Sequence, residues 1–439
     1  MTTNLEPRTP TGPAATLSPN LLLNELVAER RGRGIETLHL GFGEARLPVV
    51  PELAEVLSRA TGNTDYPPVA GTPGARRSVA GYFGRRRLPT EPEQVVLAPG
   101  SKPLLFAILA ALGGNVYLPA PCWNSYAPQV VLSGHRPVAV PIGAEHGGLP
   151  DPRLLAERIA EDRRHGNTPA AVVVNTPDNP TGTTVTLDAL HALCDVVRGS
   201  GMALVSDEIY RELHHDDSTE PGRRFTSPAE LLPELTVTCT GLSKCLAIGG
   251  WRIGAARFPR SGFGDNLRAR VLAIASNVWS AMSAPMQEVA AYAFDEPFAV
   301  TDRLRRSRLM HGSIARACHE LCRSRGAAVR APTGAFYVYA DLSSRCAALA
   351  THGAVDSASL ADVLLDRFSV AVLAGHHLGD NPRRLAFKIA TTGFVGDTDD
   401  ERLAALASPH TAAQLPHVQR RLDWLDRALA SLTHDGGTP

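Results

Sequence analysis

Lysine is nearly absent from this sequence. Only three of the 44 basic residues are lysines, Lys102, Lys244 and Lys388, and the other 41 are arginines. Arginine stays protonated at any relevant pH, whereas lysine can lose its proton, act as a nucleophile and form an imine. We therefore expect lysine to remain only where arginine cannot serve, which makes these three residues the first candidates for chemistry.

Net charge, membrane-spanning runs and a cysteine framework are also absent. The 44 basic residues balance 44 acidic ones, so no strong field favours nucleic acid, a membrane or an acidic partner. Nowhere do ~18 apolar residues follow one another, and the segment Met1 to Pro19 lacks the basic stretch and apolar run of a secretion signal. Seven cysteines, an odd number, indicate a reducing compartment rather than disulfides. Cys318 and Cys322 have no second Cys or His pair with which to form a zinc site, so we expect a cytoplasmic protein without a metal.

The length of the chain predicts more than one domain, because single cores stop growing at ~250–300 residues and this chain has 439. Residues 1–19, rich in Pro and Thr, are predicted to be a flexible arm. A short helix from Pro19 to about Arg31 begins an N-terminal segment, 20–48, that we expect to pack on the smaller domain. The large domain is predicted to cover 49–300 and the small one 301–439.

Seven short apolar runs, separated mostly by stretches long enough for a helix, predict an α/β fold. The alternation favours a mainly parallel sheet of seven strands with helices on both faces, and such sheets bind ligands beyond the carboxyl ends of their strands. After residue 300 an Arg-rich helix followed by strands and helices indicates a smaller α+β domain. The seven expected strands are Gln94–Ala98, Asn115–Leu118, Pro137–Ile142, Ala170–Asn175, Met202–Ser206, Thr236–Thr240 and Ile253–Phe258.

Polar motifs follow three of these expected strands. The segment Asn179-Pro180-Thr181-Gly182 comes after the fourth, Asp207-Glu208-Ile209-Tyr210 after the fifth, and Gly241-Leu242-Ser243-Lys244 after the sixth, with Gly250-Trp251-Arg252-Ile253-Gly254 beyond it. Each motif alone has an ordinary structural explanation: a turn, a helix start or a solvated lysine.

Together and in this order, the motifs resemble those of the fold type I enzymes that use pyridoxal 5'-phosphate, specifically the class I/II aminotransferases. The resemblance extends from about residue 38 to 392, four-fifths of the chain. Its other segments are Gly43-Glu44, Tyr66 with Gly71 and Arg76, Gly100-Ser101-Lys102, and Pro121-Cys122-Trp123-Asn124-Ser125-Tyr126.

The resemblance implies a role for each matching residue. Lys244 would hold the cofactor as a Schiff base and act as the general base, and Asp207 would keep the cofactor's ring nitrogen protonated. Asn179 and Tyr210 match the donors to its phenolic oxygen, and Trp123 matches the residue that stacks on its ring. Ser101, Lys102, Ser243 and Arg252 would bind its phosphate. Simpler explanations stay open for Trp123 as a core aromatic residue, Ser243 as a turn residue and Lys102 as a charge at a helix start.

Tyr66 resembles a tyrosine that reaches the phosphate in the neighbouring subunit, so the resemblance implies a homodimer. The chain departs from the family in having Gly241 where a hydroxyl residue often binds phosphate, with Thr240 or Ser243 as replacements. It also has Gly43-Glu44-Ala45 in place of Gly-Glu-Pro at the substrate entrance.

The position of the family's arginine that binds the substrate α-carboxylate is filled here by Lys388. Two interpretations are open: Lys388 contacts the carboxylate as a point charge, or a register change brings in Arg384 or Arg383.

The resemblance predicts transfer of an amino group between an amino acid and a 2-oxo acid. Because the same cofactor motifs serve other reactions, elimination, replacement or cyclisation on an amino acid side chain is the alternative. A non-enzymatic regulator is disfavoured, because regulators of this fold carry a DNA-binding domain and the arm before residue 20 has no room for one.

Overall fold

A seven-stranded sheet forms the centre of the large domain in the computed structural model, which describes residues 17–143, 146–216 and 224–434. The strand β8 is antiparallel to both of its neighbours, and the pairs among β3, β4, β5, β6 and β7 are all parallel. All seven predicted runs form strands of this sheet, with ends displaced by at most two residues. In sheet order the strands are β2 (Val95–Pro99), β8 (Ile253–Arg257), β7 (Thr236–Gly241), β6 (Ala203–Asp207), β5 (Pro169–Asn175), β3 (Asn115–Ala120) and β4 (Pro137–Pro141).

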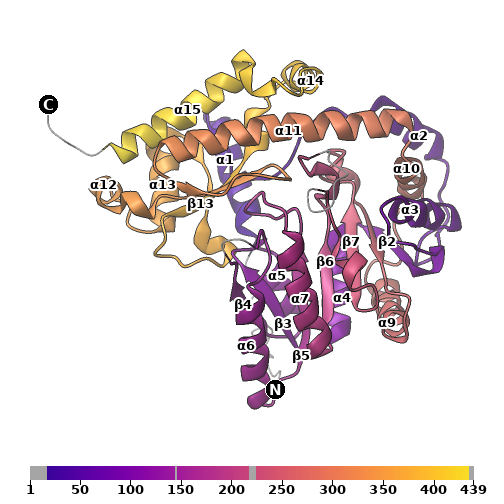
Figure 1. Ribbon diagram of the computed structural model, residues 1–439. Helices are drawn as coiled ribbons and strands as arrows, with labels where there is room; N and C mark the ends of the chain where they lie inside the picture. The colour runs from indigo at the N-terminus through magenta and orange to yellow at the C-terminus, as the bar shows by residue number, and fades with distance from the viewer. Residues whose placement is uncertain (1–16, 144–145, 217–223, 435–439) are drawn as a thin grey trace, which may run out of the picture.

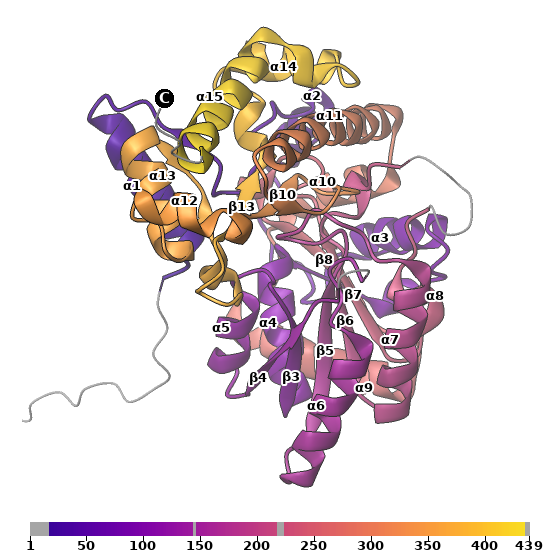
Figure 2. The same ribbon diagram turned by 60° about the vertical axis from the view of Figure 1, so that its left-hand side comes forward.

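Helices cover both faces of this sheet because both sets of alternating side chains are apolar. Val172 and Val174 of β5 belong to the core cluster beneath α6 (Pro152–Arg164) and α7 (Leu187–Ser200). Val173 points the other way, into the cluster that contains residues of α4 (Ser101–Leu112) and α9 (Gly262–Val278). The predicted α/β architecture is therefore confirmed, as the two views in Figures 1 and 2 show.

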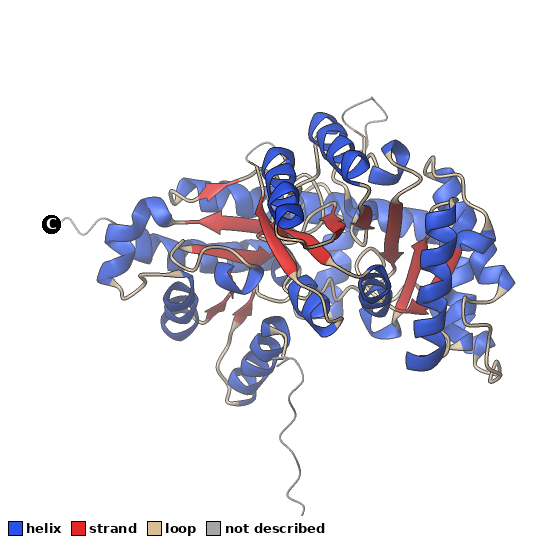
Figure 3. Cartoon of the chain, turned by 90° about the horizontal axis from the view of Figure 1, so that it is seen from below, coloured by secondary structure: helices blue, strands red, loops and turns tan. Residues whose placement is uncertain are grey.

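The C-terminal part of the chain forms a separate antiparallel sheet with its own helices. Its strand order is β12 (Leu373–Ala374), β13 (Ala386–Ala390), β10 (Tyr337–Asp341) and β9 (Ala328–Val329), and Figure 3 shows these strands apart from those of the large sheet. The long helix α11 (Phe298–Ser324) runs across the top of Figure 1 and contacts β9 and β10. Because α11 begins at Phe298, the predicted boundary at residue 300 falls in its first turn. The other helices here are α12 (Cys346–Thr351), α13 (Ser357–Phe368), α14 (Asp399–Ala407) and α15 (Pro416–Thr433).

The N-terminal segment packs on this smaller part of the molecule before the chain enters the large domain. Helix α1 (Pro19–Gly32) lies beside α13 in Figure 2, and the Arg30 guanidinium donates to the carbonyl of Leu365, 3.1 Å away. Strand β1 (Leu38–His39) pairs in parallel with β11 (Val370–Ala371). The chain then forms α2 (Pro51–Ala60) and α3 (Pro73–Arg85), which pack against α10 (Ala284–Asp295). Residues 1–16 of the predicted arm lie outside the described residues.

Candidate active site

A cavity of about 430 Å³ lies where β5, β6 and β7 end, between the large sheet, the N-terminal segment and the small-domain sheet. Its volume falls in the range of about 300–1,000 Å³ that is usual for small-molecule sites. The position agrees with the rule that parallel sheets bind ligands beyond the carboxyl ends of their strands. The sequence-predicted residues that line it are Gly43, Ser101, Lys102, Trp123, Asn179, Asp207, Tyr210, Ser243, Lys244, Arg252 and Lys388.

One end of the cavity is built to hold an anion. Gly100 connects β2 to α4 with a φ of 94°, and a Cβ there would lie 2.3 Å from an Arg252 guanidinium nitrogen, so a larger residue would be strained and would displace this guanidinium. Burial lowers the pKa of Lys102, and the neighbouring Arg252 guanidinium lowers it further. Two cations at a helix N-terminus are stabilised by a bound anion such as a phosphate. Ser243 lines this cavity, whereas the buried Thr240 lies on a different one.

Asp207, the last residue of β6, offers a buried carboxylate in the wall of the cavity. It accepts hydrogen bonds from the Tyr126 hydroxyl at 2.7 Å and from the backbone N–H of Ile209 at 3.3 Å. Burial raises the pKa of Asp207 to about 6, although both hydrogen bonds act in the opposite direction. A carboxylate held so deeply in the protein calls for a cationic or N–H partner, and the protonated ring nitrogen of pyridoxal phosphate is such a group.

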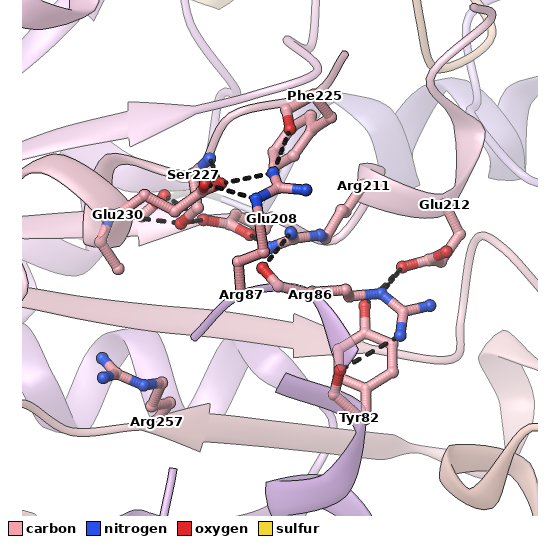
Figure 4. A network of polar contacts seen from close by, with 12 residues as sticks. Tyr82, Arg86, Arg87, Glu208, Arg211, Glu212, Phe225, Ser227, Glu230 and Arg257 are labelled. Carbon is pink, nitrogen blue, oxygen red and sulfur yellow. Dashed lines mark hydrogen bonds and ion pairs between the residues drawn. The ribbon is translucent and has the colours of Figure 1, made fainter. Parts of the chain in front are cut away.

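The loop that carries Asp207 and Tyr210 is held by ion pairs and hydrogen bonds of Glu208 and Glu212, which Figure 4 shows. Glu208 accepts hydrogen bonds from Ser227 and from the Arg211 guanidinium, the latter at 2.7 Å. Glu212 pairs with Arg86 at 2.7 Å, and although burial opposes it, this pairing lowers the pKa of Glu212 to about 2. Because breaking a buried pair such as Glu208–Arg211 costs about 3–5 kcal/mol, this pair holds the loop in place, and the half-buried Glu212–Arg86 pair adds to it.

Two tyrosines and an asparagine form the wall next to Asp207. The Tyr210 and Tyr337 hydroxyls lie 2.7 Å apart, and although burial raises the pKa of Tyr210, the nearby Asn179 side chain acts to lower it. The backbone N–H of Asn179 donates to the Asn175 carboxamide oxygen at 2.8 Å, which anchors this turn to the end of β5. The buried Oδ1 of Asn179 has no hydrogen-bond partner among the described residues, so a donor is expected from a ligand.

Lys244 follows β7 and projects its amine into the middle of the cavity. Its Nζ donates to the carbonyl of Gly43 at 2.6 Å. Burial lowers the pKa of Lys244 to about 8; the Glu44 charge raises it, while Arg252 and Lys102 lower it. With this pKa about a tenth of the amine is neutral at pH 7, far more than for an ordinary lysine, and the neutral amine is the form that acts as a nucleophile.

Lys388 lies in the middle of β13, opposite Tyr339 of β10, and its side chain is fully buried in the cavity wall. Its Nζ lies 5.1 Å from the centre of the Tyr337 ring. Burial lowers the pKa of Lys388 to about 7, and the positive charge of Lys244 contributes in the same direction.

Arg384, Arg383 and Tyr66 are not brought to this cavity. Arg384 lies in the turn before β13, exposed, and pairs with Asp341 at 2.7 Å and Asp380 at 3.1 Å. Arg383 is exposed in the same turn. The Tyr66 side chain is 93% exposed, so within one chain it contacts no cofactor site, and its role in a neighbouring subunit stays a prediction.

Sequence reasoning missed several residues of the cavity wall. Tyr126 stands in the quoted Pro121–Tyr126 segment but was given no role, although it supplies the hydrogen bond to Asp207. Tyr337 comes from a strand that had been predicted without a functional residue. Ser18 and Asn20 reach the cavity from the start of α1, where a run of leucines was the only visible signal.

Within 17–143, 146–216 and 224–434, no helix is long and apolar enough to cross a membrane. Over the same ranges, no group of three or more His, Cys, Asp or Glu side chains is arranged to hold a metal ion.

Comparison with known proteins supports the same chemistry. The family model described as "Aminotransferase class I and II" matches residues 35–392. A probable aspartate/prephenate aminotransferase of Thermus aquaticus is 35% identical over 75% of this chain and 82% of its own length, and the aspartate/prephenate aminotransferase of Cereibacter sphaeroides is 33% identical over 86% and 92%. Among solved structures, an aspartate aminotransferase from Thermus thermophilus with maleate superimposes with a TM-score of 0.78 at 26% identity, covering 94% of this chain and 97% of that one. The chain therefore belongs to the class I and II aminotransferase family.

Proposed function

We propose that this aminotransferase binds pyridoxal 5'-phosphate in the cavity, with Lys244 as its covalent anchor, and transfers an amino group between an amino acid and a 2-oxo acid. The observation that carries the proposal is the position of Lys244, whose amine shares one cavity with the buried Asp207 carboxylate and with a cluster of anion-binding groups. These three features match the aldehyde, the ring nitrogen and the phosphate of this cofactor.

The residues divide by the part of the cofactor they would hold. Ser101, Lys102, Ser243 and Arg252 surround the anion-binding end and would bind the phosphate. Asp207 would pair with the ring nitrogen, and Asn179 with Tyr210 would hydrogen-bond the phenolic oxygen. Trp123, which borders the same cavity near Lys102, would cover the ring.

When bound, pyridoxal 5'-phosphate supplies an electron sink for the negative charge that develops at the substrate α-carbon. The chain's own work is to move and hold protons around that carbon. Lys244, with its pKa of about 8, is suited to take the α-proton as a general base and to return it. Asp207, with a pKa of about 6, remains ionised near neutral pH and so keeps a proton on the ring nitrogen.

Lys388 is proposed to bind the substrate α-carboxylate. It is the cation of the cavity wall contributed by the small-domain sheet, whereas Arg384 is occupied by Asp341 and Asp380 on the surface. An ammonium group offers a point charge without the planar fork of a guanidinium, so it holds a carboxylate less rigidly. This substitution favours a substrate that sits in the cavity differently from one held by an arginine.

The protein is proposed to work as a homodimer in which Tyr66 of one subunit reaches the phosphate in the other. The support is the exposure of Tyr66, an amphipathic side chain left almost entirely in solvent within a single chain. Transfer takes precedence over elimination, replacement or cyclisation because the relatives described above are aminotransferases.

Borohydride reduction of the protein reconstituted with pyridoxal 5'-phosphate tests the assignment of Lys244. Reduction should fix the cofactor on a single peptide that contains Lys244, identified by mass spectrometry. Lys102 and Lys388 are internal controls, because both line the same cavity. Label on either of them, or none after reconstitution, would disprove the assignment.

A further inference from the structure

The cavity wall holds more acceptor groups than the cofactor and the α-carboxylate would use. Its charged residues comprise four cations, Lys102, Lys244, Arg252 and Lys388, and two carboxylates, Glu44 and Asp207. The proposed function assigns all four cations and Asp207. Among the described residues of the wall, Glu44 is therefore the charged group without a task.

Glu44 stands close to the reacting amine. The carbonyl of the preceding residue, Gly43, accepts a hydrogen bond from Lys244, and the Glu44 charge raises the pKa of that lysine. The Glu44 side chain is 44% exposed and pairs with the Arg46 guanidinium at 2.9 Å. Exposed pairs of this kind contribute only about 0–1 kcal/mol, so Arg46 does not withdraw Glu44 from a ligand.

A second acceptor in the wall comes from the start of α1. The Asn20 Nδ2 donates to the Asn124 carboxamide oxygen at 3.0 Å, and Asn124 in turn donates to the Ser18 hydroxyl at 3.2 Å. The Asn20 carboxamide is engaged through its nitrogen. Its Oδ1 is buried and has no partner within the described residues. A buried acceptor without a donor costs about 1–3 kcal/mol, a cost that a ligand donor would remove.

We propose that the substrate's side chain ends in a cationic hydrogen-bond donor, an amino or guanidinium group, which binds Glu44, with Asn20 as a second acceptor in the same cavity wall. This rests on the proposed function, in which the cations of the wall hold the cofactor and the α-carboxylate. If those cations were not occupied, they could bind a second carboxylate of the substrate. With those cations occupied, a dicarboxylic amino acid would place its distal carboxylate against Glu44, which is unfavourable. A cationic side chain would instead neutralise it.

Binding of unreactive carboxylates to the cofactor-loaded protein tests this preference without relying on turnover. The probes are 6-aminohexanoate and 5-guanidinopentanoate, which carry a distal cation, hexanoate, which carries none, and succinate and maleate, which carry a second carboxylate. Isothermal calorimetry should give at least one cationic probe a Kd lower than those of hexanoate and succinate by about tenfold or more, equivalent to ~1.4 kcal/mol.

Two variants separate Glu44 from general charge effects. Glu44→Gln should abolish the preference for the cationic probe and leave hexanoate binding unchanged. Arg46→Gln, the matched control, removes the competing surface partner and should preserve or increase the preference. The proposal is overturned if succinate or maleate binds as tightly as both cationic probes, or if Glu44→Gln leaves the preference intact.

The same samples distinguish this failure from failure of the proposed function. If borohydride labels Lys244 while the dicarboxylates bind best, the side-chain inference is wrong and the cofactor assignment stands. If Lys244 is not labelled, the cofactor assignment fails, and the inference that depends on it is overturned as well.

Discussion

Replacing Lys388 by methionine should reveal the energetic cost of burying this lysine. Lys388 is only 1% exposed to solvent, and burial lowers its pKa from 10.5 to about 7, so the folded state disfavours the charged form. Methionine fills a similar volume and carries no charge, so Lys388→Met removes the titration and leaves the packing on Tyr337 largely intact.

The sign of the pH dependence follows from the protons bound in each state. Between pH 7 and 10.5 the unfolded chain still protonates Lys388 while the folded chain releases that proton, so the free energy of unfolding rises with pH. At ~1.4 kcal/mol per pH unit, wild type should gain about 3 kcal/mol relative to Lys388→Met between pH 7 and pH 9.5. Below pH 7 both states are protonated, and the variant should keep its full advantage.

Urea unfolding of the two cofactor-free proteins at pH 6.5, 8 and 9.5 measures this difference. The midpoint of Lys388→Met should lie above that of wild type at pH 6.5, and the gap should shrink steadily as the pH rises. A gap that stays constant across this range would mean that Lys388 remains charged in the folded protein, and the argument from burial would be wrong.

Three further outcomes follow from the site. Asp207→Ala should lower kcat by about 10²-fold or more while Tyr126 loses only one hydrogen bond; activity near that of wild type would show that another acid serves the ring nitrogen. Lys388→Ala should lower kcat/KM by about tenfold or more. In wild type the affinity for the substrate carboxylate should fall as the pH rises through 7, and this fall should be absent from the variant. A damaging Arg384→Ala together with a silent Lys388→Ala would reverse the assignment. Tyr66→Phe should weaken cofactor binding by about tenfold in a protein that sediments as a dimer; a fully active monomer would contradict the shared site.

The large sheet was predictable because two sequence signals mark its strands: the apolar run itself and the turn or helix signals at its ends. Each run is short and mostly apolar, several are rich in β-branched residues, and turn or helix signals bound them, so Ala170–Asn175 and Met202–Ser206 were placed to within one residue of β5 and β6. The antiparallel direction of β8 carries no such local signal, because a strand buried on both faces looks the same in either direction.

The cofactor side of the candidate site was predictable for a related reason. Most of its residues follow strands whose carboxyl ends meet at one edge, and Arg252 stands before the antiparallel β8 at that same edge, so order along the chain translates into proximity in space. The substrate side depends on the small domain and the N-terminal segment, which reach the cavity from far along the chain. Tyr337 and Asn20 have ordinary neighbours in sequence, and only the packing of β10 and α1 against the large sheet gives them a place in the wall.

The scarcity of lysine acquires a physical explanation in this arrangement. All three lysines of the chain line the one cavity, whereas Arg252 is the single arginine among its described lining residues although the chain has 41 arginines. Their ammonium groups affect one another, since Lys102 lowers the pKa of Lys244 and Lys244 lowers that of Lys388. An arginine at position 388 would keep its charge at every pH and would stand as a permanent cation within the electrostatic reach of the amine at position 244. If Lys388 binds a carboxylate as proposed, this lysine can release its proton while the site is empty and regain it when the carboxylate arrives, so the three ammonium groups and Arg252 carry charge together only while an anion offsets them.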